Sequence, residues 1–200
     1  MTDVLGLVRG LPTAPPSELD AALDAAIRCF ARHGVTRTSM TDIGRELGVS
    51  RSNIYRQLGS IDRAVRLVMA REVHQLVHGP MADVLASATG PAAVIALLDE
   101  VVQHARRHPV LRKVLADEPE IIGPYLVTDL PEATTQIARM VEPVLKHAMA
   151  TGLVAQQDAR SLAEWLVRLA VVLIIDPPSQ PTRPLLDQLL LPVLDINGRK

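Results

Sequence analysis

The stretch from Thr38 to Asp62 constrains the fold more than any other part of the chain, because it predicts two short helices joined by a tight glycine turn. Ser39 is placed to cap the first helix, with Asp42 at its third position as in a capping box. Gly48 ends this helix, since glycine adopts the left-handed conformation of a helix C-terminus at little steric cost. Ser50 caps the second helix. Together these signals predict a helix-turn-helix.

The second helix of this pair has one apolar and one polar side. Ile54 and Leu58 fall on its apolar side, four positions apart. The side chains left to project outward are mostly charged or hydrogen-bonding, and they are Arg51, Ser52, Asn53, Tyr55, Arg56 and Gln57. Such groups suit base edges and phosphates, so we expect the chain to bind double-stranded DNA.

The expected DNA contacts divide between bases and phosphates. The residues expected to meet base edges in the major groove are Arg51, Ser52 and Asn53. The residues expected to contact phosphates are Ser39, Thr41, Tyr55 and Arg56. One short recognition helix reads few base pairs, so we expect a two-fold dimer on a pseudo-palindromic operator whose half-sites are about 34 Å apart.

Several motifs stand in the order seen in TetR-family transcriptional regulators. They are a helix over 19–33, Gly34, Thr38, the run Thr41-Asp42-Ile43-Gly44, the run Leu47-Gly48-Val49-Ser50 and the pair Ile54-Tyr55. Over residues 19–75 the chain therefore resembles that family. The resemblance implies a regulator rather than an enzyme. It further implies a homodimeric repressor that leaves its operator when a small apolar effector enters the C-terminal domain.

Two positions depart from the family pattern. Ile61 stands where the family commonly has a lysine that donates to a DNA phosphate. Gln57 and Leu58 stand where a His-Phe pair is common. The resemblance therefore implies no phosphate contact at position 61.

Composition fits a globular chain with a basic N-terminal region. Of its 200 residues 48% are hydrophobic, enough to build the core of one large or two small domains. Residues 28–66 hold eight arginines and three carboxylates, a net charge of +5, whereas the rest of the chain carries −6. This asymmetry favours a basic DNA footprint on a small domain.

The number of cysteines and the length of the apolar stretches indicate the cellular compartment. A single cysteine, Cys29, excludes an intramolecular disulfide, and we expect it to be a small semi-buried residue rather than a redox sensor. There is no basic segment ahead of the short apolar run 4–8, and no apolar stretch reaches the length of a membrane span. We therefore expect a cytoplasmic protein with no membrane partner.

The expected architecture is all-α. Residues 1–16 read as a flexible arm in which Arg9 could touch a DNA groove, 17–78 as an N-terminal three-helix helix-turn-helix DNA-binding domain, and 79–200 as a C-terminal helical ligand-binding and dimerisation domain. The helices predicted after residue 60 cover 61–77, 81–87, 91–107, 110–117, 131–150, 158–175 and 184–193. Pro143 is expected to kink or break its helix about one turn earlier. The helix over 61–77 is expected to be the only covalent path between the two domains.

The C-terminal segments are rich in Leu, Val, Ile and Met and poor in aromatic residues, which favours an aliphatic or weakly polar effector. The expected lining residues are Met140, Val144, Trp165 and Leu169. The expected polar contacts are Tyr125, Gln136 and Arg168. Arg168 stands beside apolar positions of its helix, so we expect it to pair with an internal acid such as Asp99 or Glu100, or with an anionic group of a ligand.

The last two predicted helices carry more apolar residues than one packing face needs, which favours a four-helix dimer interface. The residues expected in it are Leu162, Leu166, Leu173, Leu186, Leu189 and Leu190.

Other chemistry has weaker support. His74 and His78, like His104 and His108, are four positions apart on a helix, but two ligands are too few for a metal site. No zinc-protease motif, nucleophile elbow or phosphate loop is found, so we expect no metal, no cofactor and no enzyme. The main alternative is a ligand-independent helix-turn-helix DNA binder, and a small helical enzyme is a distant one. A cavity among the C-terminal helices favours the ligand-responsive regulator, and a filled core favours the ligand-independent binder.

Overall fold

The computed structural model describes residues 13–195, and all regular structure in this range is helical, as predicted. The described residues divide into two compact units. The N-terminal unit comprises 13–75 and 106–126, and the C-terminal unit comprises 76–105 and 127–195. The predicted DNA-binding domain, 17–78, therefore lacks the segment 106–126 of its unit. Most of the predicted arm, with Arg9, lies outside the described residues.

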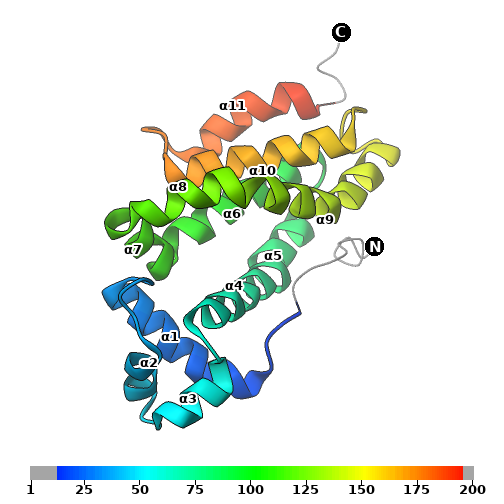
Figure 1. Ribbon diagram of the computed structural model, residues 1–200. Coiled ribbons are helices and arrows are strands. Elements are labelled where there is room, and N and C mark those ends of the chain that lie inside the picture. Colours follow the sequence, from blue (N-terminus) through cyan, green and yellow to red (C-terminus); the bar gives the residue numbers. More distant parts are fainter. Residues whose placement is uncertain (1–12, 196–200) are drawn as a thin grey trace. The chain divides into compact units, whose positions relative to one another are not determined.

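The N-terminal unit is built around one small core (Figure 1). Its elements are the 3-10 turn η2 (Ser17–Leu19), α1 (Asp20–His33), α2 (Met40–Leu47), α3 (Arg51–Leu58), most of α4 (Ile61–His78), α7 (Pro109–Asp117) and most of α8 (Pro119–Thr128). Large side chains from the first three helices fill the core and have almost no exposed area: Leu23, Phe30, Ile43, Ile54 and Leu58. Burying this apolar surface is what holds helices as short as α2 and α3 in place.

Helix α4 is fastened to α1 by a buried arginine. Arg71 is only 8% exposed. Its guanidinium donates to the carboxylate of Asp24 at 2.8 Å and to the backbone carbonyl of Asp20 at 3.2 Å. The two acceptors are one turn apart on α1, so a single side chain fixes α4 against that helix.

The C-terminal unit is also helical and has its own core. Its helices are the last turn of α4, α5 (Pro80–Ser87), α6 (Gly90–Arg107), α9 (Leu130–Ala150), α10 (Ala159–Ile175) and α11 (Thr182–Leu194). Helices α9 and α10 lie side by side (Figure 1). Buried side chains from four of these helices form the core, among them Ile95, Val102, Ala138, Leu166 and Leu190.

The structure corrects the predicted elements at two places. Helix α8 lies where no helix was predicted, since Pro119, Gly123 and Pro124 hide its periodicity. Pro143 does not break α9, which continues through it. Ala138 and Leu145, on either side of Pro143, are both buried in the C-terminal core. Their packing outweighs the loss of one backbone hydrogen bond, worth about 3 kcal/mol with the proline ring clash.

The two units are joined by more chain than predicted. Within the described residues the chain passes between them at 75/76, at 105/106 and at 126/127. The expectation that helix 61–77 is the only covalent path is therefore wrong. No helix in the described part of the chain is long and apolar enough to cross a membrane.

Candidate nucleic-acid interface

A capping box fixes the start of α2. The Ser39 hydroxyl accepts from the Asp42 backbone N–H at 3.2 Å, and the Asp42 carboxylate accepts from the Ser39 N–H at 3.0 Å. The Ser39 hydroxyl also donates to Asp42 at 2.6 Å. These hydrogen bonds from Ser39 lower the pKa of Asp42. The predicted cap is confirmed, and it directs the Ser39 hydroxyl proton to Asp42 rather than to a DNA phosphate.

The turn between α2 and α3 depends on two glycines. Gly48 has a φ of 77° and ends α2 in the left-handed conformation, as predicted. Gly44 lies where α3 crosses α2, and a Cβ added there would lie 3.2 Å from Ile54 and 3.3 Å from the carbonyl oxygen of Val49. A larger residue would push the two helices apart, so Gly44 sets their close packing.

Helix α3 carries its polar groups in two pairs. Ser50 caps the helix, as predicted, by accepting from the Asn53 N–H at 3.3 Å. The Gln57 side chain donates to the Asn53 side-chain oxygen at 2.6 Å. Two positions earlier than that pair, the Arg51 guanidinium lies 5.3 Å from the centre of the Tyr55 ring.

These pairs order the outer face of α3 before any DNA is bound. Arg51, Ser52, Tyr55 and Arg56 are exposed, while the side chains of Asn53 and Gln57 are half-buried. The buried face consists of Ile54 and Leu58, as predicted.

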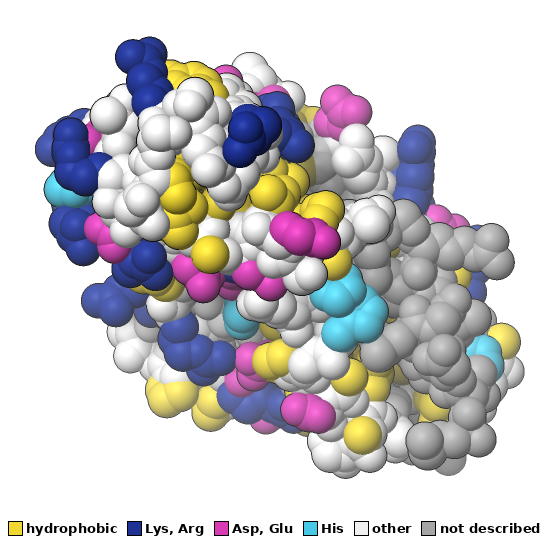
Figure 2. Space-filling view, turned by 90° about the horizontal axis from the view of Figure 1, so that it is seen from below, with side chains coloured by type: hydrophobic (Ala, Val, Ile, Leu, Met, Phe, Trp, Pro, Cys, Tyr) yellow, Lys and Arg dark blue, Asp and Glu magenta, His cyan; other side chains and the backbone are white. Residues whose placement is uncertain are grey.

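Arginines of α1 form ion pairs that join α1 to α2, whereas the arginines of α3 form none with the described carboxylates. Arg28 and Arg32 of α1 both bind Glu46 of α2. In the described part of the chain, no carboxylate lies within 4 Å of the guanidinium of Arg51 or Arg56. The positive charge of α3 is therefore not neutralised by any carboxylate in residues 13–195. Figure 2 shows Lys and Arg side chains gathered at the upper left of one face of the molecule.

Two further positions clarify the expected phosphate contacts. Thr41 is exposed on the first turn of α2, so its hydroxyl is accessible for the predicted contact. Ile61, where the family pattern has a lysine, packs against the core of the N-terminal unit. The departure at position 61 thus exchanges a surface charge for apolar packing at the start of α4.

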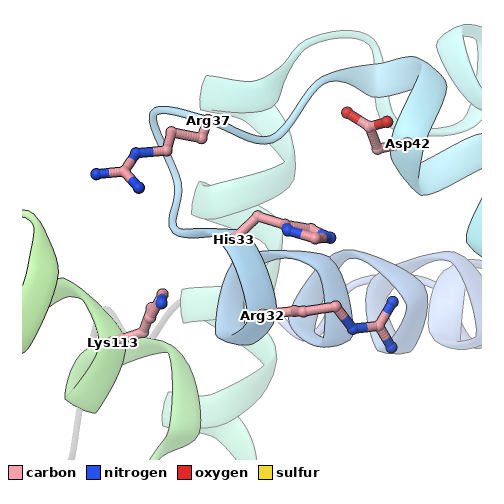
Figure 3. Close-up of a pocket in the computed structure, with 5 residues that line it drawn as sticks. All are labelled: Arg32, His33, Arg37, Asp42 and Lys113. Carbon is pink, nitrogen blue, oxygen red and sulfur yellow. The ribbon is translucent and has the colours of Figure 1, made fainter.

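A polar cavity of about 350 Å³ opens beside α2, within the N-terminal unit. Figure 3 shows the side chains that line it, which are Arg32, His33, Arg37, Asp42 and Lys113. Three of its charged groups are engaged in ion pairs, because Arg32 binds Glu46, Asp42 binds Arg45 and Lys113 binds Asp117. None of the predicted effector-contacting residues lines this cavity.

The predicted effector residues occupy different environments, and all of them except Tyr125 belong to the C-terminal unit. Leu169 packs against the core, Met140 and Val144 are half-buried, and Trp165 is 46% exposed. Gln136 is exposed and donates to Glu132. Of Tyr125 the structure gives only the backbone, in α8. One pocket lined by these residues stays a prediction.

Arg168 is not the buried arginine that its sequence position suggested. Its side chain is 55% exposed, and its guanidinium lies 3.4 Å from the carboxylate of Glu164, one turn earlier on α10. Asp99 and Glu100 are not the partners of Arg168, so the predicted pairing is wrong. Helix α10 is exposed on this side, and a charged side chain needs no interior partner there.

The predicted interface leucines belong mostly to the core of a single chain. Five of the six are at most 8% exposed, and they are Leu162, Leu166, Leu173, Leu186 and Leu190. Only Leu189 is exposed, at 50%. Assigning the five to a dimer interface is therefore wrong, because they already face α6, α9 and one another.

Histidine spacing does not build a metal centre here. Within residues 13–195, no group of three or more His, Cys, Asp or Glu side chains is placed to hold a metal ion. Cys29 is buried, more completely than the predicted semi-buried position, and burial raises the pKa of its thiol.

The capped pair α2–α3, with its uncompensated basic outer face, defines the N-terminal unit as a helix-turn-helix fold. Residues 22–63 match the family described as bacterial regulatory proteins, tetR family. The HTH-type transcriptional regulator SrpR of Pseudomonas putida is 26% identical over 134 residues, which are 65% of this chain and 60% of SrpR. The chain thus spans about 60% of the length of this curated relative.

Solved structures extend the similarity to the whole fold. The fatty acid degradation regulator FadR of Bacillus halodurans superposes with a TM-score of 0.65 at 14% identity, covering 91% of this chain and 97% of FadR. The TetR-family repressor AlkX of Dietzia sp. gives a TM-score of 0.60 at 16% identity, covering 88% and 94%. Residues 22–63 thus match the tetR family of bacterial regulatory proteins, and the chain shares its fold with solved TetR-family structures.

Proposed function

We propose that this protein is a DNA-binding transcriptional repressor that reads its operator with α3. The observation that carries the proposal is the outer face of α3, where Arg51 and Arg56 have no carboxylate partner and Asn53 is held by Gln57. Arginine and asparagine side chains recognise guanine and adenine edges in the major groove. Tyr55 and Thr41 supply neutral donors for the flanking phosphates.

The proposed assembly is a two-fold dimer, formed through the exposed faces of α10 and α11. Apolar side chains of these helices are exposed, and they are Trp165, Val172, Ile175, Leu189, Leu191 and Val193. Trp165, Val172 and Ile175 follow spacings of seven and three on α10, and Leu189 and Val193 are four positions apart on α11. Two copies of this face would bury each other and give a four-helix interface. A dimer reads two half-sites, and its operator is pseudo-palindromic.

The proposed effector is a small aliphatic or weakly polar molecule bound in the C-terminal unit, which lowers operator affinity. Its support is the composition of α6, α9 and α10, which is rich in aliphatic side chains. FadR and AlkX are named for fatty acid degradation and for n-alkane biodegradation. At 14% and 16% identity they share the fold, and the effector class rests on this chain's own residues.

A ligand-independent DNA binder is the second candidate. What favours it is the close packing of the C-terminal core, where Ile95, Val102, Ala138 and Ala163 have no exposed area. An effector would then have to open space between α9 and α10 that the described arrangement fills.

The proposal is tested by selecting duplexes from a random library with the full chain. A pseudo-palindromic consensus supports it, and retention of no duplex, or of all duplexes equally, contradicts it. Mobility-shift titrations of the selected duplex with added fatty acids, terpenoids or flat cationic dyes then separate the candidates. Release by the aliphatic compounds supports the effector-controlled repressor. Release by the dyes alone contradicts an aliphatic effector, and no release by any compound favours the ligand-independent binder.

A further inference from the structure

Glu118 is a buried carboxylate that lies outside the helix-turn-helix. Glu118 ends α7 and is 1% exposed, although glutamate is rarely buried without a partner. Burying an unpaired carboxylate is costly, so a site that keeps one supplies hydrogen bonds to it. The donors come from a segment more than eighty residues earlier in the chain.

The loop between α1 and α2 provides these donors. One carboxylate oxygen of Glu118 accepts from the backbone N–H of Val35 at 2.7 Å. The other accepts from the N–H of Thr36 at 3.0 Å and from the Thr36 hydroxyl. Three donors thus converge on both oxygens of one side chain.

Gly34 makes this approach possible. It has a φ of 88°, and a Cβ added there would lie 2.5 Å from the Glu118 carboxyl group. Any other residue would both strain the backbone and displace the carboxylate. The backbone of the loop therefore accommodates the Glu118 carboxylate only because residue 34 is glycine.

The charge state agrees with the geometry. Burial by itself raises the pKa of Glu118, but the hydrogen bonds from Thr36 and Val35, helped by nearby Arg37, outweigh it and leave the pKa below its ordinary value. Glu118 therefore accepts all three hydrogen bonds as a carboxylate at neutral pH.

We propose that Glu118 is a positioning residue for DNA recognition, which fixes the α1–α2 loop and thereby the placement of α2 and α3. The inference rests on the proposed function of α3. The Glu118 contact makes α7 and α8 part of the DNA-binding unit, and Val110 of α7 also packs against its core. Lys113 of α7 lines the same cavity as Arg32, Arg37 and Asp42 (Figure 3).

The position of this contact along the chain gives it a regulatory use. Segment 106–126 is bounded on both sides by chain of the C-terminal unit. A rearrangement of α6 or α9 is therefore transmitted along the chain to α7 and α8. Through the hydrogen bonds of Glu118, a shift of α7 and α8 then displaces the loop that leads into α2.

The test compares Glu118→Gln with the matched control Glu120→Gln, which alters an exposed carboxylate two residues further along. In Glu118→Gln an NH2 group replaces one acceptor oxygen and meets N–H donors of the loop. Hydrogen–deuterium exchange of the DNA-free, full-length protein should be about tenfold faster over 34–47 in Glu118→Gln and unchanged in Glu120→Gln. Unchanged exchange in Glu118→Gln, or an equal rise in both variants, would overturn the proposal.

Operator binding gives the second readout. Glu118→Gln should bind the selected duplex about tenfold more weakly, with the same dependence on salt concentration, because Glu118 neutralises no phosphate. Wild-type affinity in a variant whose loop exchanges faster would also overturn the proposal.

If Glu118→Gln does not fold, Thr36→Val removes the hydroxyl donor alone, and faster exchange over the same peptides is expected. A wild-type chain that retains no duplex contradicts the proposed function, whereas the exchange experiment still decides whether Glu118 fixes the loop.

Discussion

The helices of the N-terminal unit and those of the C-terminal unit are stabilised by different kinds of contact. In the N-terminal unit, short helices are fixed by individual polar contacts: the caps Ser39 and Ser50, Arg71 on α1, and Glu118 on the α1–α2 loop. In the C-terminal unit, long helices such as α9 and α10 associate through broad apolar faces. The first arrangement defines the position of each backbone segment, which a DNA-reading surface requires.

The units also differ in what they leave exposed. Among the described residues, eleven large hydrophobic side chains are exposed, and nine of them belong to the C-terminal unit. Six of the nine lie on α10 and α11. A monomer gains nothing from such a surface, so the C-terminal unit is the part of the chain expected to form contacts with a second copy.

The largest expected effect comes from charging this surface. Trp165→Glu with Leu189→Glu should convert a dimer of about twice 21.7 kDa into a monomer, as measured by sedimentation. Operator affinity should fall about 1,000-fold, because each monomer reads one half-site. Ile137→Glu, an exposed change on α9, is the matched control and should remain dimeric. A double variant that still sediments as a dimer would place the interface elsewhere.

The second expected effect separates the core from the exposed face on one helix. Leu186 has no exposed area, whereas Leu189 is half exposed. Leu186→Ala should lower the free energy of unfolding by about 2 to 5 kcal/mol, and Leu189→Ala should weaken dimerisation with little effect on the monomer's own stability. Urea unfolding over a range of protein concentrations measures both. Equal losses from the two substitutions, independent of concentration, would show that α11 has no separate outer face.

The sequence predicted the helix-turn-helix in detail, because its signals are local. Ser39 and Asp42 are three residues apart, Gly48 marks a left-handed turn, and Ile54 and Leu58 define a buried face within one helical turn. Arg71 and Glu118 were not found, since their partners lie 47 and 83 positions away along the chain. Only the fold brings them together.

Periodicity was a poorer guide in the C-terminal unit, for a physical reason. Helix α10 carries apolar residues almost all round, so a spacing of three and four fits both its inner face (Leu162, Leu166, Leu173) and its outer face (Trp165, Val172). The pattern identified helices that are apolar on two sides and did not show which side faces the core. Composition gives no better guide to the pocket, because lining and core residues have the same composition.

The third prediction concerns recognition by α3. Arg51→Ala should cost about 1 to 3 kcal/mol of binding free energy at the selected operator and much less on a scrambled duplex, because a base contact is lost. Arg45→Ala is the matched control, since Arg45 pairs with Asp42 on α2 and projects from a different helix. Mobility-shift titrations on both duplexes measure the difference. Equal losses on the two duplexes for Arg51→Ala would make Arg51 a phosphate contact.

A smaller effect is expected at the cap of α3. Ser50→Ala removes the acceptor for the Asn53 N–H and should lower the free energy of unfolding by about 1 kcal/mol. Ser52→Ala, two residues further along, removes an exposed hydroxyl that lies 3.1 Å from the Ser50 hydroxyl but caps no backbone N–H, and it should have a much smaller effect. Thermal unfolding of the two variants makes the comparison, and identical midpoints would show that α3 is held by its buried face alone.

The smallest expected effect is the pH dependence of the Glu118 contact. The pKa of Glu118 in the folded chain lies below its ordinary value of 4.5, since the hydrogen bonds from Thr36 and Val35 outweigh the opposing effect of burial. Its contribution to stability is therefore complete above pH 4.5 and is lost as the pH falls through the folded-state pKa.

Asp42 and Asp158 also have lowered pKa values, but they are present in both wild type and Glu118→Gln, so the difference between these proteins isolates Glu118. Urea unfolding from pH 7 downward should show the stability gap between them narrowing below pH 4.5. A gap that stays constant over that range would mean that the loop recognises the shape of residue 118 and not its charge.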